Sequence, residues 1–221
     1  MLRVETHCHT YISGDCLMKP RKMVEICQAR GIDRLCVTDH NSMRAVQELQ
    51  ALVDNLIIPG EEIMTTQGEL LGYFMKEEIP AGLHPFAAIE RLRAQGAVIS
   101  VSHPFDSHRN GHWQMKDLLT ILPLVDAIEV FNARCVQNKH NWQAMELAQK
   151  QGIAATVGSD AHSYGEIGQA VLEMPDFSTP QEFAQRLRQA THQTRLSPFR
   201  VHALSRWAVL VKKARKLSGR H

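Results

Sequence analysis

Short apolar runs alternate with helical patterns along most of the chain, and a small polar cluster follows nearly every run. The run at 97–102, for example, leads into His103, and the run at 153–157 leads into Gly158. Continuous apolar runs of about four to eight residues are typical of strands buried on both faces. We therefore predict six or seven strands, within residues 2–9, 35–37, 56–60, 69–75, 97–102, 126–131 and 153–157.

Turn and capping residues delimit helices between these runs. Pro20 and Gly31 bracket the first helix, and Asn41 or Ser42 is expected to cap a second that continues to about residue 53. Further helices are expected to end near residue 96 and to span about 142–150 and 179–189. Strands that alternate with helices predict an α/β fold with a parallel sheet, either doubly wound or closed into a barrel.

The length of the chain indicates one domain, and its charge distribution indicates a basic carboxyl-terminal segment. A chain of 221 residues suits one large domain. The net charge is only +2, but all 23 acidic residues precede Phe183, whereas ten Lys and Arg residues follow it. We favour a basic amphipathic helix packed on the domain over a segment that binds nucleic acid or another acidic partner.

Several protein classes are disfavoured by the composition. No apolar run approaches the roughly 18 residues of a membrane span, and the amino-terminal residues lack the apolar core of a secretory signal peptide. We therefore expect a cytoplasmic protein without a membrane partner. The five cysteines are irregularly spaced and form no Cys-x-x-Cys pair, which favours reduced, buried thiols over disulfides or a thiolate zinc site.

Histidines and carboxylates recur where the predicted strands end. His7 and His9 alternate along one strand, so their side chains point to the same face. Imidazole and carboxylate ligands suit Zn, Mn or Fe. The histidines and carboxylates at these strand ends outnumber the four ligands that one tetrahedral ion needs. We therefore expect two or three divalent metal ions that share a bridging carboxylate, for which Glu62 is the natural candidate. The later strand ends carry Asp39, His40, Glu62, His103, Asn132, Asp160 and His162.

Five of these clusters, in this order, form motifs that cover residues 2 to about 190. The chain resembles the polymerase and histidinol phosphatase (PHP) superfamily through them. The resemblance implies a distorted (β/α)7 barrel, here residues 1–195, followed by a basic helix or tail at 196–221. It also implies a trinuclear metal centre that hydrolyses phosphate esters. The motifs are His7-x-His9, Thr38-Asp39-His40-Asn41, Pro59-Gly60-Glu61-Glu62-Ile63, Ser102-His103-Pro104-Phe105-Asp106 and Gly158-Ser159-Asp160-Ala161-His162.

The resemblance also implies a distribution of ligands. Asp15 stands where some members have histidine, which would shift preference slightly toward Mn or Fe. Glu69 stands where the third site usually has histidine, and Asp39 is expected to orient a ligand rather than to bind metal. The implied sets are His7, His9, Glu62 and Asp160 on one metal, Asp15, His40 and His162 on a second, and Glu62, His103 and Glu69 on the third.

These ligands and nearby basic groups predict a phosphoesterase. Arg134, and Arg109 or His108, are candidates to neutralise a substrate phosphate, which a guanidinium binds through two parallel hydrogen bonds. Our hypothesis is in-line attack by a metal-bridging hydroxide on phosphorus, with Arg134 balancing charge and Asp160 or His162 moving the proton.

Alternative functions stay open from the sequence. A small phosphorylated metabolite or nucleotide is the expected substrate. A nuclease that trims oligonucleotide ends is a second reading, in which the segment beyond residue 183 would follow the phosphate backbone. A catalytically silent module is a third, although nearly all its ligands are present. Amide or lactone hydrolysis is weaker, because no lysine stands at a predicted strand end.

Overall fold

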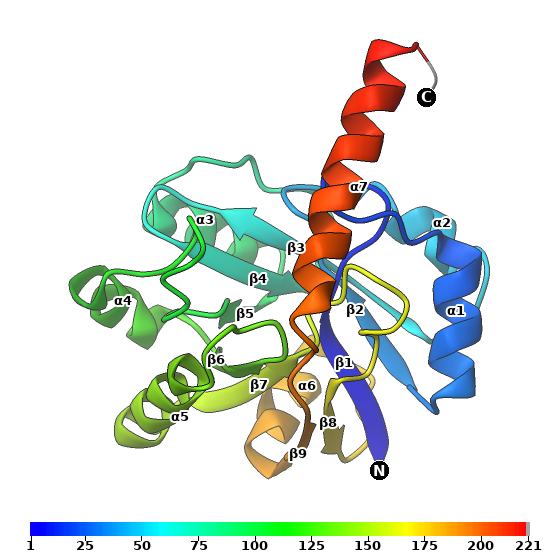
Figure 1. Ribbon diagram of the computed structural model, residues 1–221. Helices are drawn as coiled ribbons and strands as arrows, with labels where there is room; N and C mark the ends of the chain where they lie inside the picture. Colours follow the sequence, from blue (N-terminus) through cyan, green and yellow to red (C-terminus); the bar gives the residue numbers. More distant parts are fainter. Residues whose placement is uncertain (220–221) are drawn as a thin grey trace.

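One nine-stranded sheet forms the centre of the computed structural model, which describes residues 1–219 (Figure 1). Within this part of the chain, neighbouring strands follow the order β7-β6-β5-β4-β3-β2-β1-β8-β9. The strands are β1 (Leu2–Cys8), β2 (Arg34–Val37), β3 (Ile57–Met64), β4 (Glu69–Tyr73), β5 (Val98–Val101), β6 (Ala127–Asn132), β7 (Ala154–Gly158), β8 (Ala170–Met174) and β9 (Thr191–Thr194).

The expectation of a purely parallel sheet is wrong for three strands. β1, β2 and β3 are mutually parallel, as are β5, β6 and β7, but β4 runs antiparallel to both of its neighbours. A tight turn explains β4, because Thr65 N donates to the carbonyl of Gly68 at 3.0 Å, and so short a link joins only antiparallel strands. β8 is also antiparallel to β1, and β9 is antiparallel to β8.

The sheet curls until its first and seventh strands nearly meet. The backbone amide of His9, just past β1, donates to the carbonyl of Ala161, just past β7, at 3.0 Å. Thr6 in β1 donates its hydroxyl to the carbonyl of Val157 in β7 at 2.8 Å. The sheet is therefore a nearly closed barrel, which confirms the predicted class of fold and brings polar ends of distant strands together.

Helices cover the outside of the curved sheet. Figure 1 shows α1 and α2 on one side of the molecule and α3, α4 and α5 on the opposite side. Their buried apolar residues face the strands, as Met23 of α1 and Leu92 of α3 illustrate. The α-helices are α1 (Pro20–Ala29), α2 (Val46–Gln50), α3 (Pro85–Ala94), α4 (Met115–Ile121), α5 (Lys139–Gln151), α6 (Pro180–Arg186) and α7 (Arg200–Leu217), with 3-10 turns at Leu122–Leu124 and Leu187–Gln189.

The helix expected to start at Asn41 or Ser42 is much shorter than predicted. α2 spans only Val46–Gln50. Asn41 instead adopts a left-handed backbone with φ 51°, which asparagine tolerates better than most residues. Its side-chain carbonyl accepts a hydrogen bond from Met64 N at 2.8 Å, and its own amide donates to the carbonyl of Glu62 at 2.8 Å. Asn41 therefore ties the end of β2 to β3 rather than capping a helix.

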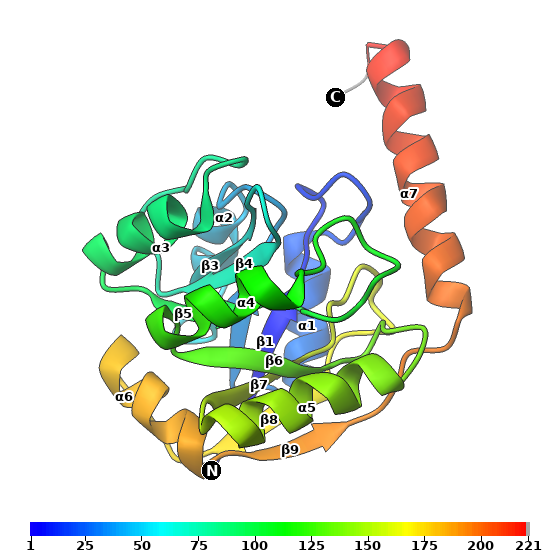
Figure 2. The same ribbon diagram turned by 90° about the vertical axis from the view of Figure 1, so that its left-hand side faces the viewer.

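The basic carboxyl-terminal segment forms α7, whose far end extends away from the barrel in both views (Figures 1 and 2). Val201, Ser205 and Ala208 are its buried residues and lie on one face. Arg220 and His221, the last residues of the predicted tail, lie outside the described residues. None of the described helices is long and apolar enough to cross a membrane.

Candidate metal centre

All nine sequence-predicted metal ligands lie at one end of the barrel. Most follow the carboxyl ends of parallel strands, but Glu69 begins β4, because an antiparallel strand starts where its neighbours finish. The structure thus brings the nine side chains together from seven segments. His7 lies in β1, His9 and Asp15 follow it, His40 follows β2, Glu62 lies in β3, Glu69 begins β4, His103 follows β5, and Asp160 and His162 follow β7.

Glu62 lies at the centre of this group. Its Oε1 is 3.0 Å from His103 Nε2 and 3.4 Å from His7 Nε2. Its Oε2 is 2.9 Å from His40 Nδ1 and 3.4 Å from His9 Nε2. Each carboxylate oxygen is therefore close to two imidazoles, an arrangement that lets one carboxylate contact two metal ions.

A cluster of three imidazoles, His9, His40 and His162, lies on one side of Glu62. Each of the three offers a nitrogen within 4.8 Å of the others. Asp15 completes this side, with Oδ2 at 3.1 Å from His162 Nε2 and Oδ1 at 3.7 Å from His40 Nε2. Asp15, His40 and His162, which the resemblance implies as the second ligand set, therefore lie near one another, with His9 beside them.

Glu69 and His103 lie on the other side of Glu62. The His103 Nε2 to Glu69 Oε2 distance is 3.4 Å, and His40, Glu62 and Glu69 offer ligand atoms within 4.8 Å of one another. Gly111 packs against Glu69 so closely that an added Cβ would collide with the carboxylate. The loop after β5 therefore fixes the position of Glu69.

Several buried ligand atoms lack a hydrogen-bond partner among the described residues. They include Glu62 Oε2, Asp160 Oδ1, Asp15 Oδ1 and His162 Nε2. Leaving one buried polar atom unsatisfied costs about 1–3 kcal/mol. Divalent ions would satisfy all four atoms at once, so this donor set fits the metals that the superfamily implies.

Neighbouring charges keep Glu62 and Asp160 ionised. Burial alone would raise the pKa of Glu62, but His7 and His40 hold that pKa well below its usual range. Burial would likewise raise the pKa of Asp160, and Arg109 and His7 hold it well below. Burial, with His162 and His40 nearby, lowers the pKa of His9. Ionised carboxylates and a neutral imidazole are the forms that bind metal.

Glu129 in β6 contacts two of the candidate ligands without being one itself, and it was not singled out from the sequence. Its Oε1 lies 2.9 Å from His7 Nδ1. Its Oε2 accepts hydrogen bonds from the amide of His103 at 2.8 Å and from Asn132 Nδ2 at 3.1 Å. The signal was a charged residue inside the apolar run of this strand, because a fully buried carboxylate needs polar partners.

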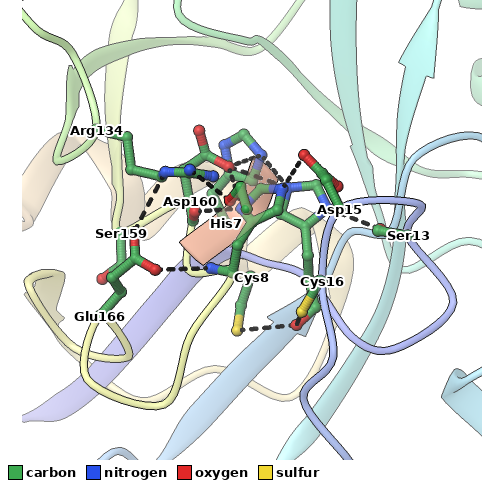
Figure 3. A network of polar contacts seen from close by, with 12 residues as sticks. His7, Cys8, Ser13, Asp15, Cys16, Arg134, Ser159, Asp160 and Glu166 are labelled. Atoms are coloured by element: carbon green, nitrogen blue, oxygen red, sulfur yellow. Dashed lines mark hydrogen bonds and ion pairs between the residues drawn. The ribbon is translucent and has the colours of Figure 1, made fainter. Parts of the chain in front are cut away.

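Asp39 orients His9 through Ser13. The Ser13 hydroxyl donates to Asp39 Oδ1 at 2.5 Å and lies 3.0 Å from His9 Nδ1. Asp39 also accepts from the amide of Thr10 at 2.7 Å. Such partners fix the ring orientation of a metal-binding histidine. Figure 3 shows Ser13 and Asp15 on the same loop beside the cluster.

A second buried glutamate, Glu5 in β1, holds the loop that carries Asp160. It accepts hydrogen bonds from the amides of Ser159 at 2.9 Å and Gly168 at 3.0 Å. Burial raises the pKa of Glu5 to about 7. Glu5 was also missed from the sequence, and it shares with Glu129 the signal of an acid inside an apolar strand.

Three arginines, Arg109, Arg134 and Arg206, line a hollow of about 670 Å³ next to the cluster. Arg109 Nη2 is 2.5 Å from Asp160 Oδ2, and its Nε is 3.1 Å from Asp106. Arg134 instead lies 3.2 Å from Glu166 and donates to Ser205 at 2.7 Å, as Figure 3 shows for Arg134 and Glu166. Arg109 is therefore the arginine in direct contact with a candidate ligand, and the catalytic role of Arg134 stays a prediction.

Comparison with known proteins places the chain in a family. The family model described as "PHP-associated" matches residues 138–191. An uncharacterised protein of Methanocaldococcus jannaschii, MJ0417, is 36% identical over 198 residues, which cover 85% of this chain and 79% of the relative. A probable phosphatase of Caldicellulosiruptor bescii is 26% identical over 204 residues, covering 77% of this chain and 84% of the relative. The chain belongs to the PHP superfamily.

Solved structures share the fold at low sequence identity. A Bacteroides vulgatus two-domain protein containing a predicted PHP-like metal-dependent phosphoesterase superimposes with a TM-score of 0.70 at 18% identity, over 88% of this chain and 65% of that one. PsfC from Pseudomonas syringae gives a TM-score of 0.70 at 21% identity, over 96% of this chain and 99% of that one. The barrel is therefore the architecture of PHP-like phosphoesterases.

Proposed function

We propose that this protein is a metal-dependent hydrolase of phosphate esters that uses two or three divalent ions. The observation that carries the proposal is the convergence of eight other potential ligands around Glu62, with buried ligand atoms left without hydrogen-bond partners among the described residues. Relatives named as probable phosphatases and structural neighbours named as metal-dependent phosphoesterases support the same class.

The ligands divide into three sets around Glu62. His7, His9 and Asp160 would share the first ion with Glu62, and Asp15, His40 and His162 would hold the second. His103, Glu62 and Glu69 would hold the third. Bound ions of this kind supply a water-derived nucleophile near neutral pH and neutralise phosphoryl oxygens. The Zn, Mn or Fe preference of this donor set follows from its imidazoles and carboxylates.

The remaining polar groups bind the ester and move its protons. Arg109 lies beside Asp160 and faces the hollow, so its guanidinium is positioned to pair with a phosphoryl oxygen. Asp160 and His162 approach within 3.4 Å and are our candidates to accept the proton of the attacking water. Arg134, on the wall of the same hollow, would contribute positive charge at longer range.

The substrate we propose is a small phosphorylated metabolite or a nucleotide. The hollow of about 670 Å³ has the size typical of small-ligand sites. Its wall combines Arg109, His108 and Arg206 with apolar Val136 and Phe199, which suits an ester with a charged end and an apolar body.

Metal reconstitution tests the proposal. Protein stripped with chelator would be reloaded with Mn, Zn or Fe and assayed against phosphomonoesters, phosphodiesters and short oligonucleotides. We expect hydrolysis that returns with at least one metal and saturates at two or three equivalents per chain. Binding of metal without turnover of any ester would favour a silent module instead.

A further inference from the structure

One face of α7 carries three exposed cations, Arg206, Lys213 and Lys216, beside the candidate metal centre. His202, Arg206, Val209, Lys213 and Lys216 follow one another at spacings of four, three, four and three, which aligns them on one helix face. His202 and Arg206 line the hollow described above. Val209, Lys213 and Lys216 line a second hollow of about 470 Å³. We call these five residues the α7 stripe.

The two hollows meet at the metal centre. Asp15 lines both of them, and His40 lines the second. The α7 stripe covers 14 residue steps, or about 21 Å of helix. An anion that follows it therefore passes the candidate ligands on its way from one hollow to the other.

The acidic groups in these hollows already have partners within the protein. Asp15 lies 3.1 Å from His162, and Asp106 lies 3.1 Å from Arg109. Arg206, Lys213 and Lys216 are exposed side chains. Their positive charge is therefore available to an incoming ligand.

We propose that the α7 stripe binds the sugar–phosphate backbone of a single-stranded nucleic acid and leads it past the metal centre. Charges on a nucleic acid strand repeat every ~3.4 Å in a duplex and further apart in an extended strand, so the stripe spans several phosphates. The small phosphorylated substrate proposed above would occupy the first hollow only, so the stripe adds a longer substrate to the same site. The inference rests on the proposed function, because the bound strand would bring its phosphodiester bonds to the metal centre that is proposed to hydrolyse them.

An exposed aromatic residue next to the stripe strengthens this choice. Phe199 lines the first hollow with 75% of its surface exposed. Aromatic platforms beside a basic groove are typical of proteins that bind single strands through base stacking. A bilayer surface fits less well, because the cations of the stripe line hollows at the barrel that a flat membrane does not enter.

Oligonucleotide binding in chelator tests the proposal separately from hydrolysis. The probes are fluorescein-labelled dT12 and U12, and the readout is anisotropy at several salt concentrations. The variant R206A/K213A/K216A is compared with wild type and with the control R21A/R91A/K150A, which removes exposed cations from α1, α3 and α5. All three proteins keep the same metal site, so its charge cancels in the comparison.

We expect the stripe variant to bind at least tenfold more weakly than the control. Loss of three phosphate contacts should also reduce the slope of log Kd against log salt by about 2. F199A should weaken binding while it leaves that slope unchanged, because stacking releases no counterions. Circular dichroism checks that each variant is folded.

Three outcomes would overturn the inference. One is equal binding by the stripe variant and the control. A second is stripe-dependent binding to vesicles that contain phosphatidylserine, with no binding of either oligonucleotide. The third is wild type that hydrolyses a small ester but ignores oligonucleotides, which would overturn this inference alone. Oligonucleotide binding without any hydrolysis would overturn the proposed function alone.

Discussion

Glu129 Oε1 lies 2.9 Å from His7 Nδ1, and both side chains are fully buried. This contact turns His7 so that its Nε2 points toward Glu62 and Asp160, at 3.4 and 3.6 Å. A carboxylate on β6 therefore sets the orientation of a candidate ligand on β1. Removing that carboxylate should weaken metal binding although Glu129 itself need not contact the ion.

Glu129→Gln is the direct test of this relationship. The amide keeps the size of the side chain but loses the negative charge opposite His7, so we expect metal affinity to fall about 10- to 100-fold. Competition with a coloured chelator measures the change. Glu146→Gln, an exposed position on α5, is the matched control. Unchanged affinity in Glu129→Gln would refute the supporting role.

His9→Ala and Asp160→Asn should each abolish hydrolysis while the far-ultraviolet circular dichroism stays the same. Asparagine is the better replacement for Asp160, because this residue has φ 50° and asparagine tolerates that backbone. We expect at least a 10³-fold loss of kcat/KM for a chromogenic phosphomonoester. Asp54→Asn, at an exposed site far along the chain, should stay within twofold. Near-normal turnover in either test variant would remove that residue from the site.

Glu69→Ala and Gly111→Ala should have the same effect on metal content. The first removes the carboxylate, and the second displaces it, because a Cβ at Gly111 collides with the Glu69 side chain. Both variants should lose one metal equivalent while the others remain, as measured by mass spectrometry of the bound ions. Gly82→Ala, where the added atom would have open space but the backbone has φ 77°, controls for the general cost of replacing a loop glycine. A full metal complement in both test variants would place Glu69 outside the site.

Metal should stabilise the folded chain as well as activate it. An ion that binds only the folded state at 100 times its Kd adds about 2.7 kcal/mol, which corresponds to roughly 5–10 °C in Tm for a chain of this size. Differential scanning fluorimetry of stripped and reloaded protein measures the shift. The Asp160→Asn variant should shift less, and an equal shift would show that the ion binds elsewhere.

The buried thiol of Cys27 should make the folded protein less stable at high pH. Burial raises the pKa of its thiol from 9.0 to about 12, with Glu5 adding to the effect. The folded protein therefore keeps a proton that the unfolded chain releases above pH 9. Stability is fully present below pH 9 and declines as the pH rises toward about 12, by on the order of 1 kcal/mol per pH unit. Guanidinium unfolding from pH 8 to 11 measures the decline, which should be smaller in Cys27→Ala.

Many of the candidate metal ligands could be predicted from the sequence, because they directly follow apolar runs or end them. His7, His103 and Asp160 all belong to such junctions. Glu5 and Glu129 escaped notice because they lie within apolar strands, where a single acid carries no spacing signal. Their importance depends on partners more than 100 residues away, as the contact between His7 and Glu129 illustrates.

The direction of the strands was harder to predict than their positions. β4 was expected as a strand, but its antiparallel direction depends on the turn from Thr65 to Gly68, whose hydrogen bonds involve Thr65 rather than a familiar pair of turn residues. α2 is shorter than predicted because Asn41 accepts a hydrogen bond from the amide of Met64 on β3 instead of capping a helix. In both cases a contact between segments outweighed a local preference.

Lys212 connects α7 to the loop that follows β1. Its ammonium group donates to the backbone carbonyls of Tyr11 and Ser13, on the loop that continues to Asp15. Lys212 therefore ties α7 to the loop that carries a candidate metal ligand. Any change in metal affinity that a ligand of α7 causes through this loop is matched by an equal change in the affinity of α7 for that ligand when metal binds.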